Sequence, residues 1–76
     1  MPRQDALRLC SRGRSVVYLQ IILRSAGYEL EPDGLFGSMT REAVKTFQAM
    51  HGIRADGVVD GDTWDALEGV MPMQMP

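Results

Sequence analysis

A twelve-residue segment occurs twice in this 76-residue chain, at 33–44 and again at 56–67. Each copy begins with Asp-Gly, continues with an apolar pair and has Thr at the seventh position after the Asp. In an Asp-Gly turn the glycine adopts a positive φ, and the Asp side chain accepts hydrogen bonds from nearby backbone N–H groups. The apolar pair is expected to hold the loop on the core, and the Thr to cap the next helix. Two such segments predict two helix-loop-helix corners that share one core.

The first helix is predicted to follow Ser15, its N-cap, and to end at Gly27. Tyr28, directly after this glycine, is expected to fold back onto Leu23. The stripe expected to be buried consists of apolar residues at helical spacing, namely Val16, Leu19, Ile22, Leu23 and Ala26.

The second helix is predicted to begin at Thr40 and to end at 51–52, with Ile53 in the place that Tyr28 has after the first. Its buried face is expected to consist of Ala43, Val44, Phe47 and Met50. The third helix begins at Thr63 and ends at about Glu68 or Gly69. The fold class predicted is therefore all-α, a compact three-helix bundle with two ordered Asp-Gly loops.

The length of the chain allows one domain, predicted to span 1–69, with 70–76 as a tail or linker rich in Met and Pro. No apolar run is long enough for a membrane span, and 1–5 lacks the apolar stretch of a signal peptide. A formal net charge of −2 argues against a nucleic-acid partner. We expect a monomer that binds neither nucleic acid nor membrane.

Catalytic and metal sites find little support in the residue types. Cys10 and His51 are the sole members of their kinds, which leaves no cluster for zinc and no third member for a nucleophile–base arrangement. A calcium loop starting at Asp56 would place Val58 and Leu67 where carboxylate ligands belong. We therefore expect no metal, no cofactor and no catalysis by this chain alone.

Two glutamines, Gln20 and Gln48, interrupt the apolar stripes at comparable places in their helices. If buried, each must find hydrogen-bond partners. We expect them to bond the Asp-Gly loops and hold them in place. Tyr18 and Tyr28 are candidates for exposed aromatic contacts with a glycan.

The order and spacing of these features resemble the peptidoglycan-binding-like domain that is attached to many wall hydrolases and phage endolysins. The resemblance runs from Leu7 to about Leu67. Its matching positions are Leu9, Gly13, Val16, Leu19, Gln20, Leu23, Gly27 and Tyr28, then Asp33, Gly34, Phe36, Gly37, Thr40, Ala43, Val44, Phe47, Gln48, Gly52 and Ile53, and finally Asp56, Gly57, Val58, Val59, Thr63, Trp64 and Leu67. The chain departs from the family at Cys10, where Gly is frequent, and at Asp60, where Gly is common.

This resemblance implies a non-catalytic module that binds peptidoglycan or muropeptides and targets an attached or partner wall hydrolase to its substrate. It implies a location in the cell wall, the periplasm or the extracellular space. Since 1–5 lacks the apolar stretch of a signal peptide, we expect the chain either to be a domain cut from a longer protein or to be released as phage proteins are. The candidate ligand-binding residues are Asp33, Gly34, Phe36, Gly37, Thr40, Gln48, Asp56, Gly57 and Trp64. Each also has a structural interpretation: the Asp residues form turns, and Phe36 and Trp64 belong to the core.

Two other functions stay open at this point. Similar domains serve as pro-segments of matrix metalloproteases, where a cysteine in a Pro-Arg-Cys-Gly context blocks the zinc. Cys10 lies instead in Arg-Leu-Cys-Ser-Arg, which weakens an inhibitory role but leaves a protein-interaction module possible. A minimal hydrolase would require that the isolated chain lyse the wall.

Overall fold

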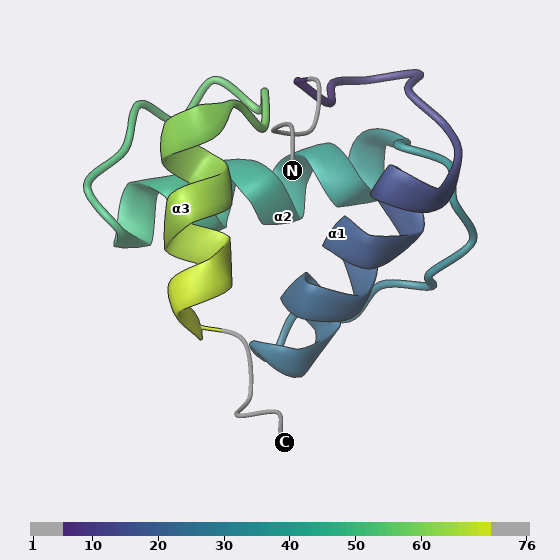
Figure 1. The fold of residues 1–76 in the computed structure, drawn as a ribbon, viewed down its shortest axis with the longest axis horizontal. Helices are drawn as coiled ribbons and strands as arrows, with labels where there is room; N and C mark the ends of the chain where they lie inside the picture. The colour runs from purple at the N-terminus through teal and green to yellow at the C-terminus, as the bar shows by residue number, and fades with distance from the viewer. Residues whose placement is uncertain (1–5, 71–76) are drawn as a thin grey trace.

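The computed structural model describes residues 6–70, which form three helices: α1 (Arg14–Ser25), α2 (Ser38–Met50) and α3 (Gly61–Val70). Helix α2 runs across the molecule, and α1 and α3 cross it toward opposite ends (Figure 1). Helix α1 packs against both of the others. The predicted all-α three-helix fold is confirmed. Within the described range, no helix combines the length and apolar character that a membrane span needs.

Each helix starts two residues earlier than predicted. Helix α1 follows Gly13 as its N-cap, so that Ser15 lies inside the first turn. Helix α2 likewise begins two residues early, after Gly37. At the other end of the chain α3 extends to Val70, and the remainder of the predicted tail, 71–76, lies outside the described residues.

The repeated threonines do not cap the helices that follow them. Thr40 and Thr63 are both buried, and each hydroxyl accepts a hydrogen bond from a glutamine amide at 3.0 Å. At α3 the capping groups belong to Asp60, whose carboxylate accepts the N–H of Thr63 at 3.4 Å and whose carbonyl accepts that of Trp64 at 2.8 Å. The side chain that distinguishes this loop from the family pattern is therefore an N-cap.

The first two helices end at Ser25 and Met50, slightly before the predicted ends, and each is closed by the predicted glycine. After α1, the N–H of Tyr28 donates to the carbonyl of Leu23 at 3.1 Å, which is the long hydrogen bond of a Schellman motif. After α2, the N–H of Ile53 donates to the carbonyl of Gln48 at 2.8 Å in the same way. These closures turn the chain sharply toward each Asp-Gly loop.

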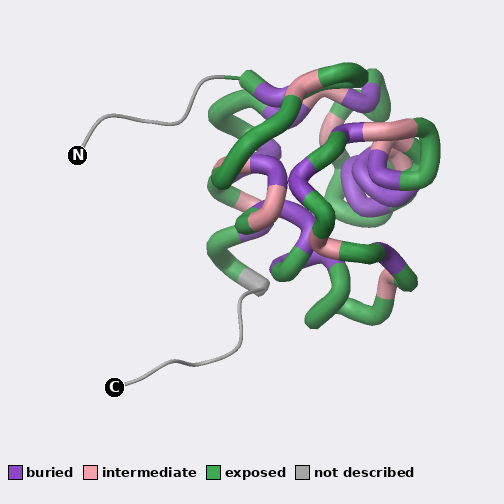
Figure 2. Tube along the Cα trace, turned by 90° about the vertical axis from the view of Figure 1, so that its right-hand side faces the viewer, coloured by how far each residue is buried: buried purple, intermediate pink, exposed green. Residues whose placement is uncertain are grey.

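The buried residues gather between the helices, while the outer turns are exposed (Figure 2). The core consists of Leu7, Val16, Leu19, Ile22, Leu23, Leu30, Phe36, Ala43, Val44, Phe47, Val59, Trp64 and Leu67. Two positions predicted to be buried are exposed: Ala26 and Met50, the latter at 75%. Ala26 follows the last residue of α1 and Met50 is the last residue of α2, so the chain there has already left the core.

The segment 7–12 lies across both Asp-Gly loops. Leu7 forms an antiparallel bridge with Val59, and Arg12 forms one with Leu35. The two hydrogen bonds between Leu7 and Val59 measure 3.1 and 2.8 Å. Cys10, in the middle of this segment, has a φ of 79°, a left-handed conformation that L-residues other than Gly, Asn and Asp seldom adopt. The segment thus joins two corners that are 23 residues apart in sequence.

Candidate functional site

The first Asp-Gly loop is held by the side chain of Gln20, which is 1% exposed. Its Oε1 accepts the N–H of Gly34 at 2.9 Å, and its Nε2 donates to the carbonyl of Leu35 and the hydroxyl of Thr40, both at 3.0 Å. The Oδ1 of Asp33 lies 3.2 Å from the same Nε2 and accepts the N–H of Leu35 at 2.9 Å. One amide from α1 therefore orders the loop and the start of α2.

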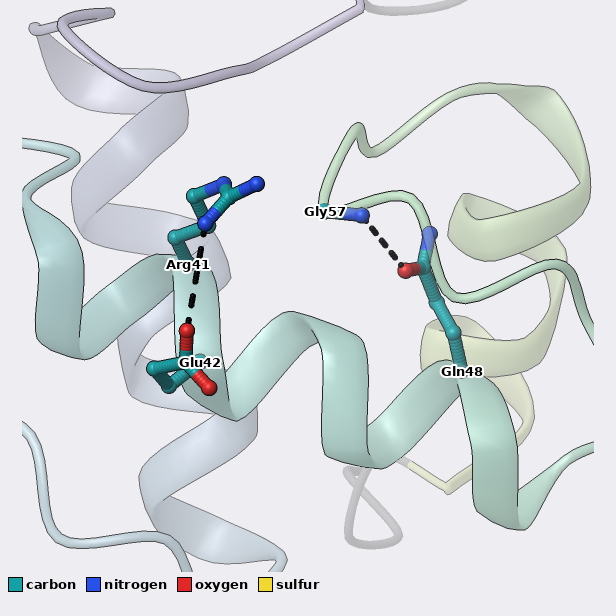
Figure 3. Close-up of polar contacts among 4 residues, drawn as sticks. All are labelled: Arg41, Glu42, Gln48 and Gly57. Carbon is teal, nitrogen blue, oxygen red and sulfur yellow. Dashed lines mark hydrogen bonds and ion pairs between the residues drawn. The ribbon is translucent and has the colours of Figure 1, made fainter.

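The second loop repeats this arrangement around Gln48 of α2. Its Oε1 accepts the N–H of Gly57 at 3.0 Å (Figure 3). Its Nε2 donates to the carbonyl of Val58 at 2.9 Å and to the hydroxyl of Thr63 at 3.0 Å, and lies 3.3 Å from the Oδ1 of Asp56. The prediction that both glutamines bond the Asp-Gly loops is confirmed.

Both loop carboxyls have a pKa below the usual 3.8. For Asp33 the largest cause is the hydrogen bond from the backbone N–H of Leu35, followed by that from Gln20. For Asp56 the largest cause is the N–H of Val58. Hydrogen bonds to the ionised form stabilise it, so both side chains are carboxylates at neutral pH.

Each loop lies close to the helix that precedes it. A Cβ placed on Gly34 would be 3.1 Å from the Cγ2 of Val17, and one on Gly57 would be 3.1 Å from the Cγ of Arg41. Figure 3 shows Arg41 on the same side of α2 as Gly57, with its guanidinium 3.8 Å from the carboxylate of Glu42. Both residues of that ion pair are exposed, so we attribute little stability to it.

The stretch of chain between the glutamine and the Asp of each loop differs in length. Gln20 and Asp33 are 13 residues apart, whereas Gln48 and Asp56 are 8 apart. The stretch from Gln20 to Asp33 contains an additional turn of helix and a longer loop after its closing glycine, Gly27. A hollow of about 780 Å³ opens there, lined by Gln20, Arg24, Gly27, Tyr28, Glu29, Leu30, Glu31, Asp33, Leu35, Gly37, Ser38, Met39 and Thr40. We call it the larger hollow.

A smaller hollow of about 550 Å³ lies on the other side of the first loop. It is lined by Arg12, Gly13, Arg14, Val17, Asp33, Gly34 and Leu35. Asp33 and Leu35 line both hollows. Leu35 is 48% exposed.

The structure distributes the predicted site residues over three environments. Asp33, Gly37 and Thr40 line the larger hollow, and Asp33 also lines the smaller one together with Gly34. Gln48, Asp56 and Gly57 belong to the second loop.

Phe36 and Trp64 are 0% and 1% exposed, as expected of core residues. Their buried rings leave no face for a sugar, which favours the core interpretation of both residues. Tyr18 lies over Trp64 with ring centroids 5.9 Å apart and is 38% exposed, and Tyr28 lines the larger hollow.

Several lining residues were not among the site residues predicted from the sequence. They are Arg12, Arg14, Arg24, Glu29, Glu31, Leu35 and Met39. The one signal in the sequence that pointed to this region was the greater length of the stretch between Gln20 and Asp33, compared with that between Gln48 and Asp56. It indicates extra chain but not the shape that the chain takes.

The residues considered for catalysis have structural surroundings. His51 stacks on Phe47 with ring centroids 4.1 Å apart, and its Nδ1 lies 3.0 Å from the carbonyl of Phe47. Cys10 is an exposed free thiol. Across residues 6–70 no three His, Cys, Asp or Glu side chains gather in a way that would hold a metal ion.

Residues 12–67 match the peptidoglycan binding domain family. The chain is 40% identical over 62 residues to the zinc D-Ala-D-Ala carboxypeptidase of Streptomyces albus G, which covers 75% of this chain and 24% of that enzyme. It is 55% identical over 39 residues to the N-acetylmuramoyl-L-alanine amidase CwlL of Bacillus licheniformis, covering 51% of this chain and 11% of the amidase. The structure of the Burkholderia AP3 phage endolysin superposes with a TM-score of 0.83 at 48% identity, covering 86% of this chain and 25% of the endolysin. The chain therefore spans a quarter or less of each of these proteins.

Proposed function

Because this chain belongs to the peptidoglycan binding domain family, we propose that it binds the wall in the larger hollow and holds an attached or partner wall hydrolase on its substrate. The three relatives described above are a carboxypeptidase, an amidase and an endolysin. In each the matching part is a minor share of the protein, as expected of a module beside a separate catalytic domain. We place this activity in the cell wall, the periplasm or the extracellular space, where peptidoglycan is accessible.

The observation that carries the proposal is the larger hollow itself. Its volume of about 780 Å³ lies within the roughly 300–1,000 Å³ of ligand pockets. Its floor contains Gln20 and Thr40, whose polar groups are fixed by the loop network. A fixed floor limits the conformational entropy lost when a ligand binds.

The rim of the larger hollow carries both signs of charge. Arg24 comes from α1, and Glu29, Glu31 and Asp33 come from the loop that follows it. Tyr28 and Met39 add apolar surface. This mixture suits a muropeptide, which combines a sugar with amino and carboxyl groups, better than it suits a neutral glycan alone.

The predicted site residues take different parts in this proposal. Asp33, Gly37 and Thr40 line the hollow and are proposed as contacts. The buried Phe36 and Trp64 support the loops from the core. We propose that the second loop, with Asp56 and Gly57 held by Gln48 of α2, orders the corner between α2 and α3 and is the weaker candidate for contact, because none of these three residues lines either hollow.

Two methionines of α2 provide a matched test. Met39 lines the larger hollow and Met50 does not, yet they are 70% and 75% exposed. Neither side chain contributes to the core, so alanine at either position should leave the fold intact. We expect Met39→Ala to weaken binding to purified sacculi in a pull-down and Met50→Ala to bind like the wild type.

The outcomes separate the parts of the proposal. A folded wild-type domain that stays in the supernatant at low salt would refute wall binding. Equal binding by both variants would move the site away from the larger hollow. Loss of turbidity in a sacculus suspension treated with the isolated domain would show catalysis. It would overturn the proposal that this domain binds the wall and that a separate hydrolase cleaves it.

A further inference from the structure

We propose that the smaller hollow is a second subsite, in which Arg12 and Arg14 bind a carboxylate of the wall ligand. This inference rests on the proposed function, since it assigns one chemical group of the same ligand to a second place. None of the family positions matched from sequence includes either arginine. The two guanidinium side chains line the same hollow from consecutive parts of the chain.

The charges of the smaller hollow favour an anion. Within residues 6–70 the structure pairs Arg41 with Glu42 but gives no ion pair to Arg12 or Arg14. The one carboxylate in the lining is that of Asp33, whose Oδ1 is already bonded to the N–H of Leu35 and the amide of Gln20. An arginine presents a planar set of N–H donors that matches a carboxylate, and such charged hydrogen bonds are among the strong ones.

The backbone holds this hollow in a defined shape. Arg12 and Leu35 face each other in an antiparallel bridge flanked by hydrogen bonds from Gly13 N–H to Gly34 O (3.0 Å) and from Phe36 N–H to Ser11 O (2.9 Å). Facing residues in this position of a ladder bring their side chains close together. The bridge therefore places the stem of Arg12 beside the exposed Leu35.

Part of the lining of the smaller hollow is apolar. Gly34 lies against Val17, so near that a Cβ on this glycine would be 3.1 Å from the valine Cγ2. Val17 and Leu35 supply apolar area, and the arginines supply the charge. The site thus fits a carboxylate carried on a small organic group, such as the acid end of a muropeptide, better than a freely hydrated ion.

The two hollows are neighbours, since Asp33 and Leu35 line both. Going from one to the other, the lining changes from two arginines to a rim in which Glu29 and Glu31 accompany Arg24. A muropeptide that reaches both hollows would be oriented by these charges, with its carboxylate at Arg12 and Arg14. Together the two hollows would distinguish the carboxyl end of the ligand from its amino end.

The test compares two double variants of equal charge. Arg12→Gln with Arg14→Gln removes the proposed donors, and Arg8→Gln with Arg54→Gln removes two positive charges that line neither hollow. Isothermal titration calorimetry measures binding of a muramidase-released disaccharide-peptide and of the same fragment with its carboxyl groups converted to methyl esters. Circular dichroism melting checks that each variant is folded.

We expect the Arg12/Arg14 variant to bind the free-acid fragment about tenfold more weakly than the wild type, as for the loss of a charged hydrogen bond. It should bind the ester as the wild type does, and the Arg8/Arg54 variant should bind both fragments like the wild type. Equal weakening in both double variants would reveal only general electrostatic attraction and overturn the subsite. So would equal affinity of the wild type for acid and ester.

Wall phosphate is the competing source of negative charge. If the Arg12/Arg14 variant loses binding to intact sacculi but not to sacculi stripped of phosphodiester-linked polymers, the anion is a phosphate and the carboxylate assignment is wrong. If the wild type binds neither sacculi nor fragment, the proposed function itself fails. Wild-type binding that is unchanged by Arg12→Gln with Arg14→Gln refutes this inference alone.

Discussion

Replacing Gln48 with leucine removes the amide that joins α2 to the second Asp-Gly loop while nearly preserving the side-chain volume. The amide receives one hydrogen bond from Gly57 and donates to Val58, Thr63 and, at the longer distance of 3.3 Å, the carboxylate of Asp56. Gly57 and Thr63 are buried, so water cannot readily replace the lost partner. Thr63 keeps a second contact, with the carboxylate of Asp60 at 3.4 Å. The N–H of Gly57 keeps none among the hydrogen bonds of the described residues.

The magnitude follows from the groups left without partners. Each buried polar group without a partner costs about 1–3 kcal/mol, so the N–H of Gly57 and the partly buried carbonyl of Val58 together give a loss of about 3 kcal/mol. A chain of this length has a total stability of about 4–11 kcal/mol. The variant should therefore be folded but close to its limit, with a melting temperature lowered by more than about 10 °C.

Trp64 provides the assay, because it is the sole tryptophan and is 1% exposed in the folded state. Urea unfolding followed by its fluorescence measures the free energy of unfolding of the wild type and of Gln48→Leu. Ala49→Leu, at the next position and exposed, is the control and should leave stability nearly unchanged.

A loss of less than about 1 kcal/mol in Gln48→Leu would refute the reasoning, because it would mean that the loop finds other partners or that the amide is not needed. The same variant also tests the predicted role of Gln48 in binding. If it binds sacculi normally at a temperature where it is fully folded, its role is structural. Lost binding in the folded variant would return the second loop to the ligand site.

Three further changes have outcomes that follow from the backbone and the charges. Cys10→Gly should raise stability by about 0.5–1 kcal/mol in thermal melts, because glycine adopts a φ of 79° without strain, whereas Cys10→Ala should give no gain. Gly34→Ala should lower stability by about 1–2 kcal/mol, since its φ is +82° and its methyl would lie 3.1 Å from a valine methyl, while Gly69→Ala, with open space around it, should not. The lowered pKa of Asp33 and Asp56 predicts stability that is complete above their usual value of 3.8 and is lost as pH falls through their lower folded-state values. Replacing both with Asn should reduce the loss of unfolding free energy at acid pH, measured by urea titration. An unchanged dependence of stability on pH would contradict the lowered pKa of these carboxyls.

The site divides into a part that the sequence reasoning reached and a part that it did not. Gln20 and Gln48 were expected to bond the loops because a polar side chain in an apolar stripe needs buried partners, and they do. Thr40 and Thr63 were expected as caps because Thr is frequent there, but tertiary contact with those glutamines takes their hydroxyls instead. The preference of Thr for N-cap positions was therefore outweighed by hydrogen bonds to a glutamine that is distant in sequence.

The hollows could not be inferred from the repeated segments, since they depend on residues that lie outside those segments. The additional residues between Gln20 and Asp33 create the larger hollow. The smaller one requires residues 7–12 to cross the first loop, and no periodicity in that segment indicates this pairing. A β-bridge of one residue pair leaves too short a pattern to be recognised.

By itself the sequence determined the three helices, their closure at Gly27 and Gly52 and the two Asp-Gly turns, because spacing, glycine and turn residues act over a few positions. The doubled segment also determined that the two corners would use the same bonds. Only the tertiary structure decided that the corners differ in shape: one is held around Gln48, and the other opens beside Gln20 into the larger hollow. That difference depends on where chain segments far apart in sequence come to lie, and therefore on packing across the whole core.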